Sequence, residues 1–477
     1  MRLGSEAEKD LKQILGSEGE YSLDPSDLSH FGKDWSGLVD PNPSVIVFPK
    51  TTAAVARVMK YCFERKIPVV PSGGRTGLSG GAIAAQGEWV LSLSKMNRME
   101  KVDVLSRTVR VQAGAVTEAV HDHCRPKGLT WPVDFASKGS SQVGGNIATN
   151  AGGVRVIRYG NTRNWVLSIQ AVQMDGTVLE LNGDLEKNNT GYDLRQLLVG
   201  SEGTLAVITE ATLKLCPLEE NVEVGLFRCR DLSQVIELFQ ATRVAGFPVM
   251  AFETLSAACL SESTKFLNQA APFSLEGWGA QGFVVLCEAM NADGLLVHEK
   301  WVEFLESGLA EDAVVAQNPK QKSEFWALRE SVAEAVFAGT GHGVHAGAWV
   351  YQHDVSVPIP SLTDFSKKLL AKYAADYPEF EIFLFGHIGD GNLHVFIRSK
   401  PAAGLTKEEF VQRCKSSDQH LFKFIQDFKG SVSAEHGIGL LKKNALPYSR
   451  PAHEIALMKG IKKAFDPSHL LNPGKLL

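Results

Sequence analysis

Apolar and polar positions predict a strand, a helix and a second strand in the first part of the chain. Residues 44–48 and 67–70 are short runs of β-branched and apolar residues. Between them, apolar residues recur at the spacing i, i+3, i+4 and i+7, which is typical of one face of a helix: Val55, Val58, Met59 and Cys62. Thr51 or Thr52 precedes this run and can cap the helix. The pattern therefore predicts a β-α-β unit over residues 44–71.

The rest of the first half is mainly β in pattern. We expect strands at residues 89–93, 108–113, 165–174, 177–181 and 204–215, and a helix at 117–127. Asp175-Gly176 is expected to join the strands 165–174 and 177–181 in a hairpin. The second half alternates strands such as 349–357 with amphipathic helices, at residues 231–245, 321–337, 361–376 and 406–428, and a last helix at 454–465. This alternation predicts an α+β fold, with an antiparallel sheet covered by helices on one side. The stretch 217–220 is the expected boundary between the halves.

One predicted hairpin carries two histidines. Asp390-Gly391 lies between apolar runs, and a two-residue turn there would pair residue 387 with residue 394. His387 and His394 would then face each other with Cβ atoms roughly 5 Å apart. Glu435, beside His436, offers a third ligand, and three protein ligands are typical of a catalytic metal site. The alternative is that these are unrelated histidines in a glycine-rich turn.

Composition narrows the class of protein. The 477 residues allow two or three domains, and a net charge of −5 gives no reason to expect nucleic-acid binding. The seven cysteines form no C-x-x-C pair, which indicates reduced thiols in a cytoplasmic protein. We expect no signal peptide and no transmembrane helix. Peripheral attachment to a membrane and a homodimer both remain open.

Two glycine-rich tracts point to a phosphate-containing cofactor. Residues 72–81 follow a β run and contain five glycines and one arginine, and the backbone N–H groups of such a loop can bind phosphate oxygens. Neither a Walker A loop nor a Rossmann fingerprint fits it. Gly77–Gly81 matches the G-x-S-x-G elbow of hydrolases, but residues 82–86 are too short for the helix that this motif requires. The second tract, 139–153, is small and polar and could lie against an aromatic ring system.

These stretches resemble a known flavoprotein family. Residues 71–81, 144–153 and 200–205 are similar to the FAD domain of the vanillyl-alcohol oxidase / p-cresol methylhydroxylase flavoproteins. Residues 387–394, 435–437 and 472–475 resemble the branch of D-lactate and D-2-hydroxyglutarate dehydrogenases. The resemblance implies an FAD-binding domain (1–217), a substrate domain (218–430) and a C-terminal segment (431–477) that returns to the flavin.

The resemblance also implies roles for individual residues. The FAD pyrophosphate would be held by Ser72, Gly73, Gly74, Arg75, Thr76, Gly77 and Ser79. The flavin and its ribityl chain would be lined by Gly144, Gly145, Asn146, Thr149 and Asn150, with Ile208 nearby. Gly152, Gly203 and Asn472 complete the implied cofactor-binding set. Some relatives tether the flavin through a histidine in the first loop; this loop has none, so the FAD is expected to be non-covalent.

By the same resemblance, His387, His394 and Glu435 bind Zn²⁺ or another divalent metal, His436 is the catalytic base, and Arg329 grips the substrate carboxylate. The implied reaction is oxidation of a D-2-hydroxy acid to the 2-oxo acid by hydride transfer to flavin N5. The expected electron acceptor is a quinone, an electron-transfer flavoprotein or another carrier. A zinc hydrolase using the same three metal ligands is the alternative from another class.

The substrate side chain is the open question. Residues 187–194 are closer to the 2-hydroxyglutarate branch, which makes D-2-hydroxyglutarate the leading substrate. Ala333, Gln352 and Phe396 depart from that branch, because they stand where a hydroxyl, a lysine and an asparagine are usual. D-lactate or a longer apolar D-2-hydroxy acid is therefore the alternative. The glycine- and histidine-rich stretch 338–348 could re-line the pocket, with His342 and His345 as loop residues.

Overall fold

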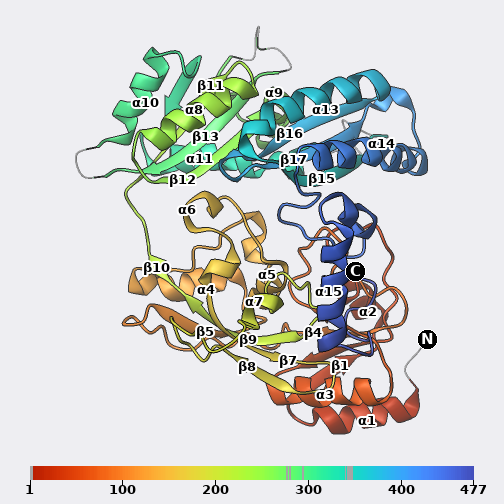
Figure 1. Cartoon of the computed structure of the whole chain (residues 1–477). Coiled ribbons are helices and arrows are strands. Elements are labelled where there is room, and N and C mark those ends of the chain that lie inside the picture. The colour runs from red at the N-terminus through yellow and green to blue at the C-terminus, as the bar shows by residue number, and fades with distance from the viewer. Residues whose placement is uncertain (1–3, 275–277, 279–280, 293–294, 339, 341–346) are drawn as a thin grey trace. The chain divides into compact units, whose positions relative to one another are not determined.

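The computed structural model describes residues 4–274, 278, 281–292, 295–338, 340 and 347–477. The chain divides into two units (Figure 1). Unit 1 consists of Met1–Gly153, Tyr159–Leu218 and Glu435–Leu477, and unit 2 consists of Val154–Arg158 and Glu219–Ala434.

Unit 1 contains the predicted β-α-β unit. Its first sheet has the order β1-β2-β4-β3, formed by Gly19–Ser22, Val45–Pro49, Trp89–Ser92 and Val69–Ser72. Strand β4 lies between β2 and β3 and is parallel to both, whereas β1 is antiparallel to β2. Helix α3 (Thr52–Glu64) has the predicted cap, because Thr51 Oγ1 accepts a hydrogen bond from the Ala54 amide at 3.1 Å. Helices α1 (Ser5–Leu15) and α2 (Pro25–Phe31) complete this part.

A second sheet in unit 1 is antiparallel. Its order is β5-β9-β7-β8, formed by Thr108–Gln112, Val207–Lys214, Val166–Val172 and Val178–Leu181. The buried face of α3 shares one apolar core with residues of both sheets. The remaining elements of unit 1 are short, apart from the last helix: α4 (Thr117–Cys124), β6 (Leu129–Thr130), α5 (Val143–Thr149), α7 (Arg195–Leu198), β10 (Cys216–Pro217) and α15 (Ala452–Phe465).

The C-terminal tail is built into unit 1. Leu471 bridges Val69 on strand β3, and the Asn472 amide donates to the Val69 carbonyl at 2.7 Å. On α15, the buried Lys462 ammonium donates to the Thr204 carbonyl at 2.7 Å, the Leu471 carbonyl at 2.8 Å and the Asp466 carboxylate at 2.6 Å. One cation therefore ties together the last helix, the tail and the loop at residues 200–205.

Replacing Lys462 with methionine should destabilise the protein by about 3–5 kcal/mol, because Asp466 is fully buried and would lose its cation. The matched control is Lys463→Met, which alters the neighbouring exposed lysine. Urea unfolding of the holoprotein measures both variants. Equal midpoints for the two would show that the Lys462 contacts contribute nothing.

Unit 2 is organised around a seven-stranded antiparallel sheet. Its order is β14-β11-β13-β12-β16-β17-β15, formed by Asp312–Val315, Val222–Cys229, Phe283–Met290, Val249–Ser256, Phe380–His387, Asn392–Ser399 and Val350–Ser356. Its helices are α8 (Leu232–Val244), α9 (Ala257–Leu267), α10 (Val297–Glu306), α11 (Pro319–Glu330), α12 (Val332–Phe337), α13 (Leu362–Asp376) and α14 (Lys407–Asp427). The single helix expected over residues 321–337 is two helices, which meet at Ser331.

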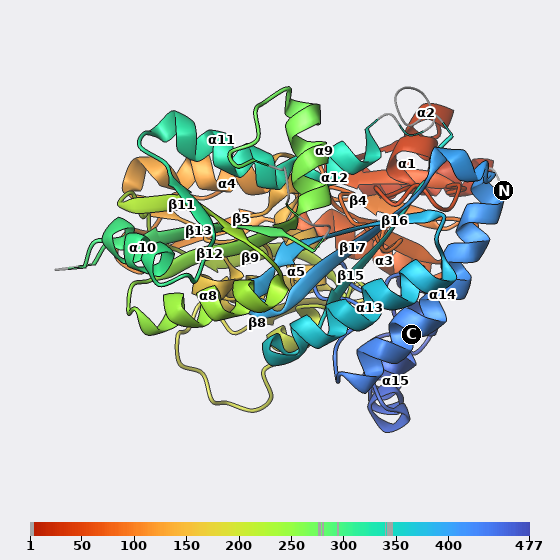
Figure 2. The ribbon, with the colours of Figure 1, turned by 90° about the horizontal axis from the view of Figure 1, so that it is seen from above.

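Helices pack on both faces of this sheet, not on one as expected. Leu226 lies in a core with residues of α9 and α11, whereas the next residue, Phe227, packs edge-on against Trp301 of α10. Adjacent residues of a strand point to opposite faces. Figure 2 shows α8 on one side of the strands and α11 on the other. The α+β class with a helix-covered antiparallel sheet is confirmed.

Residues 154–158 are a short excursion that belongs to unit 2; α6 (Val156–Tyr159) overlaps it. Arg155 pairs with the buried Glu288 of β13, whose carboxylate also accepts from the Trp326 indole at 2.8 Å. A side chain on Gly389 would collide with Ile157, so the excursion lies directly against the turn that follows β16.

The predicted register of the histidine hairpin is wrong by two residues. His394 pairs with Phe385, not with His387, and the turn is a short 3-10 helix, Ile388–Asp390, followed by Gly391 at φ 82°. Asp390 keeps a negative φ, so no type I′ turn forms. His387 instead pairs with Glu253 of β12. A shift by an even number of residues leaves both histidines on the predicted face.

Among the described residues, no helix combines the length and apolar character that a membrane span requires.

Candidate active site

The two glycine-rich tracts meet inside unit 1. A Cβ atom on Gly74 would lie 2.2 Å from the Ser140 carbonyl oxygen, and one on Gly73 would lie 3.7 Å from the Gly145 amide nitrogen. A Cβ atom on Gly144 would lie 2.6 Å from Cβ of Ala113. Glycine at these positions therefore lets backbone approach backbone.

Several buried polar atoms beside these tracts have no hydrogen-bond partner within the described part of unit 1: Ser72 Oγ, Gln142 Oε1, Ser201 Oγ and Asn472 Oδ1. Buried polar atoms are normally paired, so such a cluster indicates a polar ligand. The Asn472 amide nitrogen, in contrast, donates to the carbonyls of Gly81 and Glu202 at 3.0 and 2.8 Å. These atoms fit a ligand with many acceptors and donors, such as FAD.

The second tract contains a helix that its composition did not predict. Residues 143–149 form α5, which ends at Asn150 in a left-handed conformation (φ 51°). The Asn146 side chain points inward and donates to Thr117 Oγ1 at 2.7 Å, and Thr149 Oγ1 donates to the Gly145 carbonyl at 3.0 Å. Asn150 Oδ1 accepts from the Arg163 amide at 3.0 Å. The polar side chains thus hold the tract in shape.

Arg75 also has a left-handed backbone (φ 59°), and its guanidinium lies over the Phe31 ring at 4.4 Å and donates to His30 Nε2 at 2.8 Å. Burial and the Arg75 charge lower the pKa of His30. Burial also lowers the pKa of Arg75.

The predicted histidine pair is present in unit 2. The His387 and His394 rings lie 5.4 Å apart between centroids at an angle of 82°, and each offers a ring nitrogen within 4.8 Å of the other. Both side chains are buried. Two imidazoles at this separation can bind one metal ion.

A buried carboxylate lies near Nδ1 of each histidine. The sequence patterns did not indicate either of these two acids. Nδ1 of His387 donates to Glu253 at 2.7 Å, and Nδ1 of His394 lies 3.7 Å from Asp354. Glu253 is also paired with Arg329 at 2.7 Å. Metal-binding histidines commonly have a carboxylate on the second ring nitrogen, which fixes the tautomer. An acid in an otherwise apolar strand such as β12 is the signal that could have identified Glu253.

Asp354 also anchors the chain that leads to Glu435. Its carboxylate accepts from the Asn392 amide group at 2.8 Å and from the Ala434 backbone amide at 3.1 Å. Asp354 is fully buried. The position of Ala434 relative to the histidine hairpin is therefore fixed by hydrogen bonds within unit 2, and Glu435 is the next residue of the chain.

In unit 1 the segment after Glu435 is fixed by its backbone. Ser79 Oγ donates to the carbonyls of His436 and Gly437 at 2.9 Å each. The buried Glu202 carboxylate accepts from the Ile438 and Gly439 amides at 2.8 and 2.6 Å. Burial raises the pKa of Glu202, although these two hydrogen bonds oppose the shift. Ser79 is thus a structural hydrogen-bond donor, which argues against a nucleophile elbow.

The guanidinium of Arg329 lies beside a cluster of apolar side chains. It sits over the Phe385 ring at 5.2 Å, and Phe385 belongs to a core cluster with Leu255 and Phe396. Ala333 packs against the same cluster, and Gln352 pairs with Phe396 across neighbouring strands. His342 and His345 lie outside the described residues.

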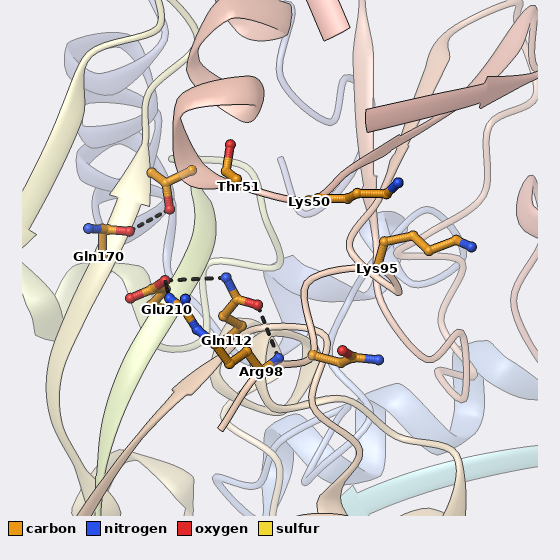
Figure 3. A pocket seen from close by; sticks show the side chains of 9 residues that line it. Lys50, Thr51, Lys95, Arg98, Gln112, Gln170 and Glu210 are labelled. Atoms are coloured by element: carbon orange, nitrogen blue, oxygen red, sulfur yellow. Dashed lines mark hydrogen bonds and ion pairs between the residues drawn. The ribbon is translucent and has the colours of Figure 1, made fainter. Parts of the chain in front are cut away.

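A surface pocket of about 460 Å³ lies elsewhere in unit 1 (Figure 3). Its lining includes Lys50, Lys95 and Arg98, but none of the predicted site residues. Gln112 accepts from the Arg98 amide at 3.0 Å, and Gln170 accepts from Thr52. Lys50 and Lys95 are paired with Glu20. Several of its polar groups are thus paired with one another or with Glu20, and we assign it no role.

The chain is similar to known proteins over most of its length. The family described as FAD linked oxidases, C-terminal domain, matches residues 218–476, and the FAD binding domain family matches residues 43–182. A D-2-hydroxyglutarate dehydrogenase of Xanthomonas citri pv. viticola is 43% identical over 455 residues, 95% of this chain and 93% of that protein. One of Stutzerimonas stutzeri is 40% identical and covers 97% of each chain.

A solved structure of alkyldihydroxyacetonephosphate synthase matches with a TM-score of 0.76 at 18% identity, over 100% of this chain and 86% of that one. At this identity the match shows the fold alone.

Proposed function

Because the chain belongs to the FAD-linked oxidase family that includes D-2-hydroxyglutarate dehydrogenases, we propose that this FAD-dependent oxidoreductase converts a D-2-hydroxy acid to the 2-oxo acid. D-2-hydroxyglutarate is the leading substrate. The observation that carries the proposal is the pair of buried histidines. Glu253 is hydrogen-bonded to Nδ1 of His387, Asp354 lies 3.7 Å from Nδ1 of His394, and the buried Nε of Arg329 has no hydrogen-bond partner among the described residues.

His387, His394 and Glu435 are the proposed ligands of Zn²⁺ or another divalent metal. The hydrogen bond between Nδ1 and Glu253 leaves Nε2 of His387 available as a ligand atom. Glu435 follows Ala434, whose amide is held by Asp354, so the chain itself brings a carboxylate toward the hairpin. Two histidines and one carboxylate leave a coordination position open for substrate.

We assign two further residues to the reaction. His436 accepts the proton of the substrate hydroxyl as the C–H bond at C2 breaks. Arg329 binds a substrate carboxylate: its Nε is buried and has no hydrogen-bond partner among the described residues. When bound, FAD supplies the hydride acceptor at N5, and the metal ion supplies a Lewis acid that lowers the hydroxyl pKa.

The proposed FAD site is the junction of the glycine-rich tracts in unit 1. Residues 72–79 would hold the pyrophosphate, while Gly144, Gly145, Asn146, Thr149 and Asn150 would line the flavin. Ile208, Gly152, Gly203 and Asn472 complete the set. The domain limits 1–217, 218–430 and 431–477 and the non-covalent attachment of FAD are parts of the same proposal.

Replacing Gly145 with alanine should weaken FAD binding by about 1–3 kcal/mol, because the new methyl group would enter the space proposed for the cofactor. A Cβ atom at Gly145 meets no protein atom within 4 Å, so the apoprotein should remain folded. Gly460→Ala is the matched control, because it lies in a helix with equally open space. FAD titration of the apoproteins measures the effect; equal affinity in both variants would contradict the proposed flavin position.

A D-2-hydroxy acid with an apolar side chain, D-lactate or a longer one, is the second candidate substrate. It is favoured by the apolar cluster of Leu255, Phe385 and Phe396 beside Arg329, because such surroundings suit an apolar side chain better than a distal carboxylate.

We expect a quinone, an electron-transfer flavoprotein or another carrier as electron acceptor. The seven buried free cysteines favour the reducing cytoplasm. Peripheral membrane attachment and a homodimer remain part of the hypothesis.

Anaerobic reduction of the bound flavin by a panel of D- and L-2-hydroxy acids tests the proposal. D-2-hydroxyglutarate should bleach the flavin absorption band faster than D-lactate, and L-acids should leave it unchanged. Faster reduction by longer apolar D-acids would select the second candidate. Failure of every 2-hydroxy acid would contradict the proposed reaction.

A further inference from the structure

Glu253 contacts two different functional groups at once. It lies on β12, its side chain is 1% exposed, and its carboxylate is 2.7 Å from both His387 Nδ1 and a terminal guanidinium nitrogen of Arg329. We infer that Glu253 is a positioning residue that fixes the metal ligand His387 and the carboxylate-binding Arg329 relative to each other. This inference rests on the proposed function of these two residues.

The contact with His387 sets the tautomer of the ring. A carboxylate only accepts hydrogen bonds, so the proton of the neutral ring is on Nδ1 and the lone pair is on Nε2. The backbone supports this geometry, because Glu253 and His387 are paired directly across β12 and β16. Nε2 is therefore the nitrogen that His387 presents to a metal ion.

The contact with Arg329 sets the position of the guanidinium. One terminal nitrogen is held by Glu253 and the planar group lies over Phe385, while Nε remains a buried donor without a partner among the described residues. The Glu253 carboxylate lies 2.7 Å from that terminal nitrogen and so offsets the arginine charge in the interior.

A purely structural ion pair would need only the arginine. Glu262 serves as the comparison in the same unit: it is 8% exposed and pairs with the buried Arg398 at 2.8 Å and with Lys265 at 3.1 Å. Glu253 contacts the proposed metal ligand His387 as well as an arginine. Loss of Glu253 should consequently change metal binding, which loss of a structural ion pair should not.

The test compares Glu253→Gln, Glu262→Gln and Arg329→Lys in the FAD-loaded full chain. Zn²⁺ affinity is measured by competition with a chromogenic chelator, and KM by steady-state turnover of D-2-hydroxyglutarate. Glu253→Gln should weaken Zn²⁺ binding about 10- to 100-fold and raise KM. Arg329→Lys should raise KM alone, and Glu262→Gln should leave both at the parental value. Parental Zn²⁺ affinity in folded Glu253→Gln would overturn the inference.

A second measurement observes His387 in the parent protein and so does not depend on how the Glu253 variant folds. Nitrogen-15 chemical shifts of the metal-free protein labelled at histidine, with His387→Asn for assignment, should show His387 protonated at Nδ1. Protonation at Nε2 would refute the role of Glu253. If the parent protein failed to bind Zn²⁺ while His387 was protonated at Nδ1, the proposed metal site would fail and the Glu253 contact would stand.

Discussion

Replacing His436 with alanine should slow reduction of the bound flavin by D-2-hydroxyglutarate about 100- to 10,000-fold, because the substrate hydroxyl would lose its general base. FAD should stay bound, since the His436 backbone carbonyl, not its ring, accepts the hydrogen bond from Ser79. Stopped-flow absorbance under anaerobic conditions measures the rate, and the flavin-to-protein ratio measures occupancy.

His453→Ala is the control for the His436 variant, because His453 is an exposed histidine of the same C-terminal segment. It should reduce its flavin at the parental rate. Parental reduction by His436→Ala would assign the proton transfer to another group.

Replacing either His387 or His394 with alanine should remove Zn²⁺ binding at micromolar metal and reduce turnover at least as strongly as loss of His436. A site with one histidine and one carboxylate lacks the three protein ligands of a catalytic zinc site. Zn²⁺ content after gel filtration and turnover with added metal measure the effect.

His298→Ala serves as the control for the metal-ligand variants, since His298 is half exposed in unit 2 and pairs with Glu223. It should retain parental metal content. Metal content equal to the parent in both His387→Ala and His394→Ala would mean that the ion binds elsewhere.

Local patterns predicted much of the backbone. The apolar spacing at Val55, Val58, Met59 and Cys62 identifies α3, and Thr51 is its cap. The hairpin was predicted from Asp390-Gly391, but its register was not. That register depends on β12, which pairs with His387 and is distant in sequence. Helix α5 was missed because Gly144, Gly145 and Asn146 are poor helix formers, and tertiary contacts outweigh this preference.

Only part of the candidate site could be predicted, for a similar reason. Histidines in a motif are visible in the sequence. Glu253 is a single acid in an apolar strand and Asp354 lies in a strand of mixed polarity, and they become partners of His387 and His394 only through sheet pairing. The excursion at residues 154–158, with Arg155 on Glu288, likewise has no local signal. Long-range pairing, not composition, determines these contacts. The assigned roles of individual residues remain predictions.

Hydride should leave C2 of a D-2-hydroxy acid at a site that needs the divalent metal. The most direct test is anaerobic single-turnover mixing of the holoprotein with D-2-hydroxyglutarate carrying hydrogen or deuterium at C2, before and after removal of metal by a chelator. The flavin band should bleach more slowly with deuterium, should persist after metal removal, and should bleach again once Zn²⁺ is restored. Bleaching at an unchanged rate in the metal-free protein, or none with metal present, would contradict this account.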